Sequence, residues 1–228
     1  MRRFLNPATL VLLLVLAYMA ISGGRFSDPL GWLMRVLYTL PGIIVAITCH
    51  EFAHAFSAYK LGDQTPKIQG RVSLNPLRHL DPFGLLCIIF IGFGWGKPVM
   101  VNPLGFRHRR RDEIIVSLAG VTTNLFLAVI FCGLCSFFLY SGTFSNVLYF
   151  AAYINIILMV FNLIPVPPLD GFNVLTELLH IKYTETYYKI YNNGMWILML
   201  LIVFGVAGAI LDNTVPHIFT FLFGLFMW

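Results

Sequence analysis

The chain has 228 residues and a formal net charge of +5; 58% of its residues are hydrophobic and only 11% are charged. This composition excludes a soluble protein. Several apolar runs approach or exceed the roughly 20 residues that cross a bilayer as a helix. The sequence therefore predicts a multi-pass membrane protein, and the positive charge bears on its membrane topology rather than on nucleic acid.

The first apolar stretch predicts a membrane span over about residues 4–22. Its centre, Leu10 to Ile21, resembles a secretory signal peptide, but no convincing small-x-small cleavage site follows, so we expect a retained helix. Gly23-Gly24 and Asp28-Pro29 then predict a turn. A second span is expected over about residues 32–59.

The second span contains His50-Glu51-Phe52-Ala53-His54, an H-E-x-x-H pattern. Positions i and i+4 lie on the same face of a helix, so His50 and His54 can bind one metal ion. Glu51, beside the first ligand, can take a proton from a metal-bound water. The pattern predicts a catalytic zinc site. The alternative, a helix with two core histidines, would bury Glu51 without a partner at considerable cost.

Residues 60–111 form a long loop that contains nine Lys or Arg and only two acidic residues. By the positive-inside rule this loop faces the cytoplasm. His54 and His50 lie 6 and 10 residues before Lys60. At about 1.5 Å per residue, they lie roughly 9–15 Å below the cytoplasmic end of a span about 30 Å thick. Ionisable residues at such a depth indicate function.

Two features of this loop have competing interpretations. His79 is expected to be an interfacial residue paired with Asp81, and the alternative is a gating or auxiliary role. The cluster Arg107-His108-Arg109-Arg110-Arg111 is interpreted as an anchor at the lipid headgroups rather than as a nucleic-acid site.

After the loop, the apolar runs predict four more spans, which brings the total to six and places both termini in the cytoplasm. A short interfacial helix is expected within residues 169–192. The predicted spans are about 113–140, 146–164, 194–211 and 215–228.

A catalytic zinc ion takes three protein ligands and keeps one position open. Asp170 is the best candidate for the third ligand, because it follows the fourth span on the same side of the membrane as the histidines. It lies in Asn162-Leu-Ile-Pro-Val-Pro-Pro-Leu-Asp170-Gly171, whose prolines force irregular backbone that is tolerated near the membrane only beside protein or water. The alternative is that Asp170 caps the following helix. The spacing leaves both possibilities open.

Together the two motifs resemble the site-2 protease family of intramembrane zinc metalloproteases. That family pairs H-E-x-x-H in one transmembrane helix with N-x-x-P-x-P-x-L-D-G at the end of another. The resemblance covers about residues 40–175, with one departure: Val121 replaces the proline of the family's A-G-P-x-x-N pattern. The matching positions are Asn162, Pro165, Pro167, Leu169, Asp170 and Gly171, with shorter matches at Gly62-Asp63, Gly70-Arg71, Asn75-Pro76, Asp81–Gly84 and Gly96–Val99.

The resemblance implies an all-α polytopic membrane protein of about six transmembrane helices. It also implies a membrane-dipping β-hairpin or re-entrant segment near residues 85–99, whose edge could hold an extended substrate by strand addition. We expect a single integral membrane protease domain over residues 1–228, with its catalytic core at about 32–175. It would be a minimal, core-only member without a PDZ or regulatory domain.

The resemblance also assigns roles within the site. His50, His54 and Asp170 would bind one Zn²⁺ per chain, Glu51 would be the general base and acid, and Asn162 would bind the developing oxyanion. Asn124 would support the active-site region.

The implied function is zinc-dependent hydrolysis of peptide bonds within or near the transmembrane segments of single-span membrane proteins. The expected location is a prokaryotic cell membrane, with the active site nearer the cytoplasmic side. The expected partners are these substrates and the lipid bilayer, with no nucleic acid; the sequence gives no indication of an oligomeric state.

Two other functions would leave different signs in the sequence. A zinc-binding membrane protein that handles substrates without cleaving them would predict a defect in Glu51, Asn162 or Asp170, and none is present. A metal transporter would favour ligands spaced along the spans, whereas the sequence offers a single cluster.

Overall fold

The computed structural model describes residues 26–139 and 142–227, together with Leu14, Ala17, Tyr18, Ile21, Ser22 and Gly24. The expected first span over residues 4–22 therefore lies almost wholly outside the described residues. All regular secondary structure in the described part is helical, which confirms the all-α prediction. Four described helices are long and apolar enough to cross a membrane, as a multi-pass membrane protein requires: α2 (Pro29–Lys60), α5 (Arg109–Phe137), α6 (Thr143–Leu163) and α10 (Val206–Gly224).

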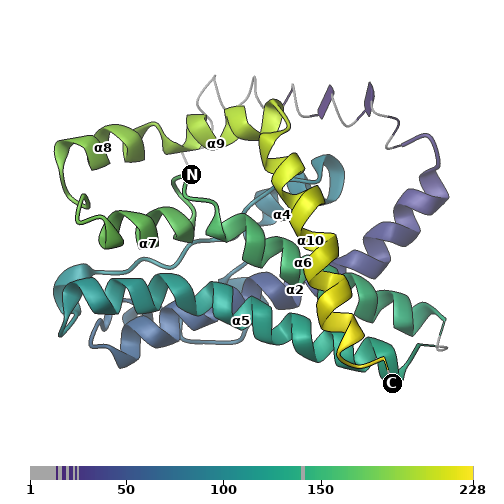
Figure 1. The fold of residues 1–228 in the computed structure, drawn as a ribbon, viewed down its shortest axis with the longest axis horizontal. Coiled ribbons are helices and arrows are strands. Elements are labelled where there is room, and N and C mark those ends of the chain that lie inside the picture. The colour runs from purple at the N-terminus through teal and green to yellow at the C-terminus, as the bar shows by residue number, and fades with distance from the viewer. Residues whose placement is uncertain are drawn as a thin grey trace.

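Helices α2, α5 and α6 pack against one another in pairs, and α10 crosses α6 and α5 (Figure 1). Gly42 permits the close contact between α2 and α6, because a Cβ atom there would lie 2.8 Å from Ala151 Cα. Helix α5 runs without a break through Val121, the departure from the family pattern. The central core is built by α5, α6 and α10 from Val121, Ala128, Cys132, Ala152, Ile156, Met159, Val160, Val215 and Leu222.

The segment near residues 85–99 does not form the expected β-hairpin. Its first half is helix α4 (Pro82–Ile91), which begins at an N-cap where Asp81 accepts a hydrogen bond from the Gly84 amide and ends at Gly92 with a φ of +89°. The chain returns in extended form and makes one isolated antiparallel bridge, between Leu80 and Gly96. The apolar run satisfies its own backbone hydrogen bonds as a helix, which an unpaired strand near lipid cannot do.

The last two expected spans are divided differently in the structure. A short helix, α9 (Gly194–Val203), ends just before Gly205, whose φ of +74° favours glycine. Helix α10 then continues through residues 212–214, which lie between the two expected spans. The Asn213 amide donates to the Ala209 carbonyl one turn back, so its side chain is satisfied within the helix. Six spans are thus not confirmed for the described residues.

Two further helices, α7 (Asp170–Leu178) and α8 (Glu185–Asn192), follow α6 and lie on one side of the bundle (Figure 1). Glu177 is buried, and its Oε1 lies 3.3 Å from Lys182 Nζ. Burial raises the pKa of the Glu177 carboxyl, and the charge of Lys182 opposes that shift. Arg110 Nε donates to the Glu177 carbonyl at 2.9 Å. These contacts fix α7 against the start of α5.

The connection between α2 and α5 carries three more short helices besides α4. They are α3 (Thr65–Ile68), η1 (Pro76–Arg78) and η2 (Pro103–Gly105). Buried Asp63 joins the two ends of this connection, because its carboxylate accepts from the Thr65 and Asn102 amides at 2.9 and 2.7 Å. The connection is therefore held together by its own polar contacts rather than by the pairing of β-strands.

Candidate metal centre

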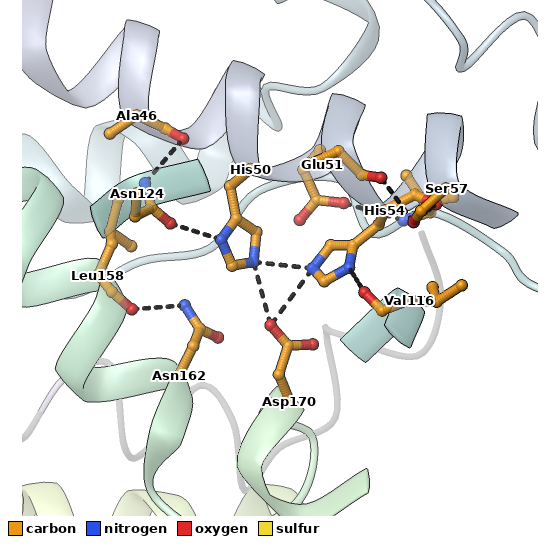
Figure 2. A network of polar contacts seen from close by, with 12 residues as sticks. Ala46, His50, Glu51, His54, Ser57, Val116, Asn124, Leu158, Asn162 and Asp170 are labelled. Atoms are coloured by element: carbon orange, nitrogen blue, oxygen red, sulfur yellow. Dashed lines mark hydrogen bonds and ion pairs between the residues drawn. The ribbon is translucent and has the colours of Figure 1, made fainter. Parts of the chain in front are cut away.

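The two histidines of the H-E-x-x-H pattern project from α2 into the interior of the bundle, and Asp170 meets them from α7 (Figure 2). Their Nε2 atoms lie 3.0 Å apart, and each lies 3.2 Å from Asp170 Oδ2. His50, His54 and Asp170 thus form the cluster with metal-ligand geometry in the described part of the chain. The structure brings together the three residues that the sequence selected as ligands.

The proline-rich turn after α6 places Asp170. Gly171 lets this turn fold back on α6, because a Cβ atom there would lie 2.3 Å from the Leu163 carbonyl oxygen. Asp170 is the first residue of α7; Leu169 occupies the N-cap position and makes no side-chain cap bond. The interpretation of Asp170 as a helix cap is therefore wrong, and its carboxylate points to the histidines instead.

The opposite ring nitrogen of each histidine has a partner on α5. His54 Nδ1 lies 2.7 Å from the Val116 carbonyl oxygen, and His50 Nδ1 lies 2.6 Å from Asn124 Oδ1. A carbonyl oxygen only accepts, so Nδ1 of His54 carries the proton and its Nε2 presents a lone pair. Such a partner for the non-ligating nitrogen is the usual companion of a metal-binding histidine.

The chemistry of this cluster fits zinc. Two ring nitrogens and one carboxylate oxygen face one another, and a cation between them would stabilise this arrangement. Asp170 Oδ2 is buried and has no hydrogen-bond partner in the described structure. Two ligands bonded to one tetrahedral zinc ion at 2.0–2.1 Å are about 3.3 Å apart, close to the observed separations. Two histidines and one carboxylate are a known ligand set for catalytic zinc.

Helix α5 can approach the rings only because residue 120 is a glycine. A Cβ atom at Gly120 would lie 2.5 Å from His54 Nε2 and 2.6 Å from His50 Cε1. Gly120 therefore leaves the space in which the two metal-binding nitrogens meet the carboxylate.

Glu51 lies on the side of α2 that faces the extended segment after α4. Its Oε2 accepts a hydrogen bond from the Val99 amide at 3.1 Å. The guanidinium of buried Arg71 binds the Lys97 and Arg78 carbonyl oxygens, and the Lys97 amide donates to the His79 carbonyl at 2.7 Å. Arg71 thus anchors the strand-like segment that orients Glu51.

Arg71→Met is expected to lower the rate of the peptide hydrolysis that the sequence predicts at least tenfold, while the zinc content stays the same. The substitution removes two hydrogen bonds from a charged guanidinium to the Arg78 and Lys97 carbonyl oxygens, worth about 1.5–3 kcal/mol each, so the segment that presents the Val99 amide to Glu51 loosens. Cleavage kinetics and elemental analysis of the purified variant test this. Arg78→Met is the control, because the Arg78 guanidinium makes an exposed bond to the Gly70 carbonyl; equal activity of the two variants would contradict the role of Arg71.

The structure also gives the positions of Asn162 and His79. Asn162 lies near the histidines on the same side as Asp170 (Figure 2), and its amide nitrogen donates to the Leu158 carbonyl at 2.9 Å. His79 is fully buried and lies 2.6 Å from the Ser73 carbonyl through Nε2, whereas Asp81 caps α4. The expected pairing of His79 with Asp81 is therefore wrong: the His79 ring contacts the Ser73 carbonyl, and the backbone carbonyl of His79 accepts from the Lys97 amide.

Sequence reasoning gave no role to three contributors to the site. Arg71 lay within a family match but carried no assigned function. Val116 contributes only its backbone carbonyl, which no side-chain pattern reveals. Asn155 of α6 is not a metal ligand, but its side-chain oxygen accepts a hydrogen bond from Asn124. A polar amide in the middle of an apolar run indicates function, and this signal could have identified Asn155 from the sequence.

An H-E-x-x-H helix that shares a metal-binding cluster with an aspartate from another element, inside a bundle of membrane-spanning helices, defines the class of membrane zinc metalloproteases. The model of peptidase family M50 matches residues 138–205. Together with the relatives described next, this match shows that the chain belongs to family M50, the site-2 protease family, and is a metalloprotease.

Three relatives support this assignment. The Bacillus subtilis protein named "Putative zinc metalloprotease YwhC" is 45% identical over 150 residues, which cover 62% of this chain and 68% of the relative. Proteins named "Putative zinc metalloprotease Rip2" are 30% identical in Mycolicibacterium smegmatis and in Mycobacterium tuberculosis; each alignment covers 92% of this chain, and 84% and 79% of the relative. No solved structure gives a significant match.

Proposed function

We propose that this protein is an intramembrane zinc metalloendopeptidase that hydrolyses peptide bonds within or near the transmembrane segments of single-span membrane proteins. The observation that carries the proposal is the convergence of His50, His54 and Asp170, with Glu51 beside them held by a backbone amide. These three residues would hold one zinc ion per chain.

In the proposed reaction, a bound zinc ion supplies Lewis-acid chemistry, which polarises the scissile carbonyl and makes a water molecule more acidic. Glu51 takes one proton from that water as the oxygen attacks the carbonyl carbon. Glu51 then delivers the proton to the leaving nitrogen as the C–N bond breaks. The Val99 amide keeps the Glu51 carboxylate aligned for both transfers.

Asn162 is proposed to bind the oxyanion that develops on the attacked carbonyl. A primary amide has two N–H donors, and only one of them is directed at the Leu158 carbonyl. The second donor can therefore stabilise negative charge on the substrate. A substrate helix must unwind locally before attack, because its carbonyl oxygens are otherwise bonded within the helix.

The proposed orientation places the active site nearer the cytoplasmic side. The end of α2 at Lys60, the start of α5 at Arg109 to Arg111 and the turn around Lys182 all carry basic residues. The contacts between Arg110 and the end of α7 support their lying at the same end of the bundle. The positive-inside rule then assigns this end to the cytoplasm.

Removal of zinc is expected to abolish cleavage reversibly. The wild-type protein, purified in detergent, would be analysed for metal and incubated with a panel of single-span membrane proteins before chelation, after chelation and after zinc is restored. An Asp170→Asn preparation, purified in parallel, is the blank for contaminating proteases because it lacks one ligand. About one zinc per chain with chelator-sensitive cleavage supports the proposal.

Other outcomes discriminate against it. Zinc bound stoichiometrically without cleavage of any panel member would favour a zinc-binding protein that handles substrates without cutting them. Cleavage that persists in the Asp170→Asn blank would come from a contaminant. A wild-type protein that binds no zinc would contradict the metal centre itself.

A further inference from the structure

Asn124 bonds the ring of His50 on the side away from the metal cluster (Figure 2). Asn124 is fully buried in α5, and its side chain lies 2.6 Å from His50 Nδ1. An amide group can turn either its oxygen or its nitrogen toward a neighbour. Which of the two faces His50 decides whether that histidine can bind a metal.

The two orientations of the amide have opposite effects on His50. If the oxygen faces Nδ1, it accepts a hydrogen bond, so Nδ1 carries the proton and Nε2 offers its lone pair to the metal cluster. If the nitrogen faces Nδ1, the ring must accept there, and the proton of the neutral imidazole moves to Nε2. That proton would occupy the lone pair on which zinc binding depends.

Asn155 determines which way the Asn124 amide is turned. It is fully buried in α6, and its Nδ2 donates to the Ala151 carbonyl at 2.8 Å. Because a backbone carbonyl only accepts, the nitrogen of Asn155 must face Ala151, and its oxygen must face Asn124. That oxygen lies 2.9 Å from Asn124 Nδ2 and can only accept, so Asn124 must turn its own oxygen toward His50.

A second contact agrees but is weaker. Asn124 Nδ2 also donates to the Ala46 carbonyl, at 3.3 Å rather than 2.9 Å. The two bonds use both hydrogens of the Asn124 amide, and loss of the shorter one would leave a buried donor unsatisfied. Burying an amide side chain in an apolar helix costs free energy unless the amide is hydrogen-bonded. The hydrogen bonds of Asn155 to Ala151 and Asn124 offset this cost.

We infer that Asn155 is a positioning residue that holds His50 in the tautomer required for metal binding. The donor–acceptor order runs from the Ala151 carbonyl through Asn155 and Asn124 to His50 Nδ1. Asn155 touches neither the metal ligands' binding atoms nor Glu51, so it acts only through Asn124. The inference deepens the proposed function and rests on its zinc site.

Asn155→Leu is expected to weaken zinc binding about tenfold, in the range seen when supporting hydrogen bonds of metal ligands are lost. Zinc affinity of the detergent-purified full chain would be measured by competition with a chromophoric chelator. Ile156→Ala is the matched control, since Ile156 is the next residue of α6, equally buried, and outside the hydrogen-bond chain. It should lower thermal stability without changing zinc affinity.

Two further variants separate positioning from structural support. Asn124→Asp presents an acceptor to His50 whichever way the group is turned, so Asn155→Leu should change zinc affinity less than about twofold in that background. Asn155→Asp keeps an acceptor toward Asn124 and should bind zinc within about threefold of the wild type. The second variant also guards against a leucine variant that does not fold.

Each outcome bears on the inference. A tenfold loss in the wild-type background that disappears beside Asn124→Asp supports it. Equal losses in both backgrounds would show that Asn155 merely supports α6, and no loss in either would show that it does not position His50; both results overturn the inference and leave the zinc site intact. A wild-type chain without zinc would refute the zinc site and, with it, the inference.

Discussion

Glu51→Gln is expected to retain zinc and to cleave substrate about 10²–10⁴ times more slowly than the wild type, the range for loss of a general base. Glutamine has nearly the same shape as glutamate, and its side-chain oxygen can still accept the hydrogen bond from the Val99 amide. The side chain therefore stays in place but cannot take a proton from water. Single-turnover cleavage of one defined substrate measures the loss.

The matched control for this variant is Glu185→Gln. Glu185 is an exposed glutamate of α8 that pairs with Lys189 one turn away, so the same chemical change there should leave cleavage unaltered. Zinc content must be measured on all preparations. Wild-type rates in a zinc-loaded Glu51→Gln protein would remove Glu51 from the mechanism.

Gly120→Ala is expected to reduce both zinc affinity and cleavage more than about a hundredfold. The added methyl group would lie 2.5 Å from His54 Nε2, which is inside van der Waals contact. The ring cannot rotate away freely, because its Nδ1 is bonded to the Val116 carbonyl at 2.7 Å. A displacement of about 1 Å at a catalytic group can cost about 10²-fold in rate, and the loss of ligand geometry adds to it.

Gly133→Ala in the same helix is the control. A Cβ atom there would meet the ring of Phe226 at 3.2 Å, a side chain near the end of the described chain. Both substitutions change helix propensity alike, so only the clash at the metal centre distinguishes them. If both variants kept normal zinc affinity, the close approach of α5 to the histidines would not be a feature of the folded protein.

Much of this site could be predicted because its elements are local in sequence. The i, i+4 spacing of His50 and His54 requires only that the segment be helical, and α2 extends from Pro29 to Lys60, close to the expected 32–59. The spans containing α5 and α6 were also predicted within a few residues. Long apolar runs define such helices because the bilayer thickness sets their length.

The errors arose where one residue or a tertiary contact overrides hydropathy. Gly205 ends α9 by adopting a left-handed conformation, whereas Asp212 and Asn213, which lie between the two expected spans, continue a helix. The apolar run before Gly92 formed a helix because Asp81 caps it. The roles of Arg71 and Asn155 depend on contacts across 26 and 31 positions of the chain, which a single sequence does not reveal.

The two halves of the metal centre differ in what anchors them. His54 depends on the Val116 carbonyl, which is present whatever side chain stands at that position, whereas His50 depends on the side chains of two asparagines. Substitutions at the two asparagines can therefore change the orientation of His50, whereas substitutions at position 116 leave the hydrogen bond to His54 in place. In a saturation mutagenesis of this protein, tolerance should be broad at position 116 for apolar residues and narrow at positions 124 and 155.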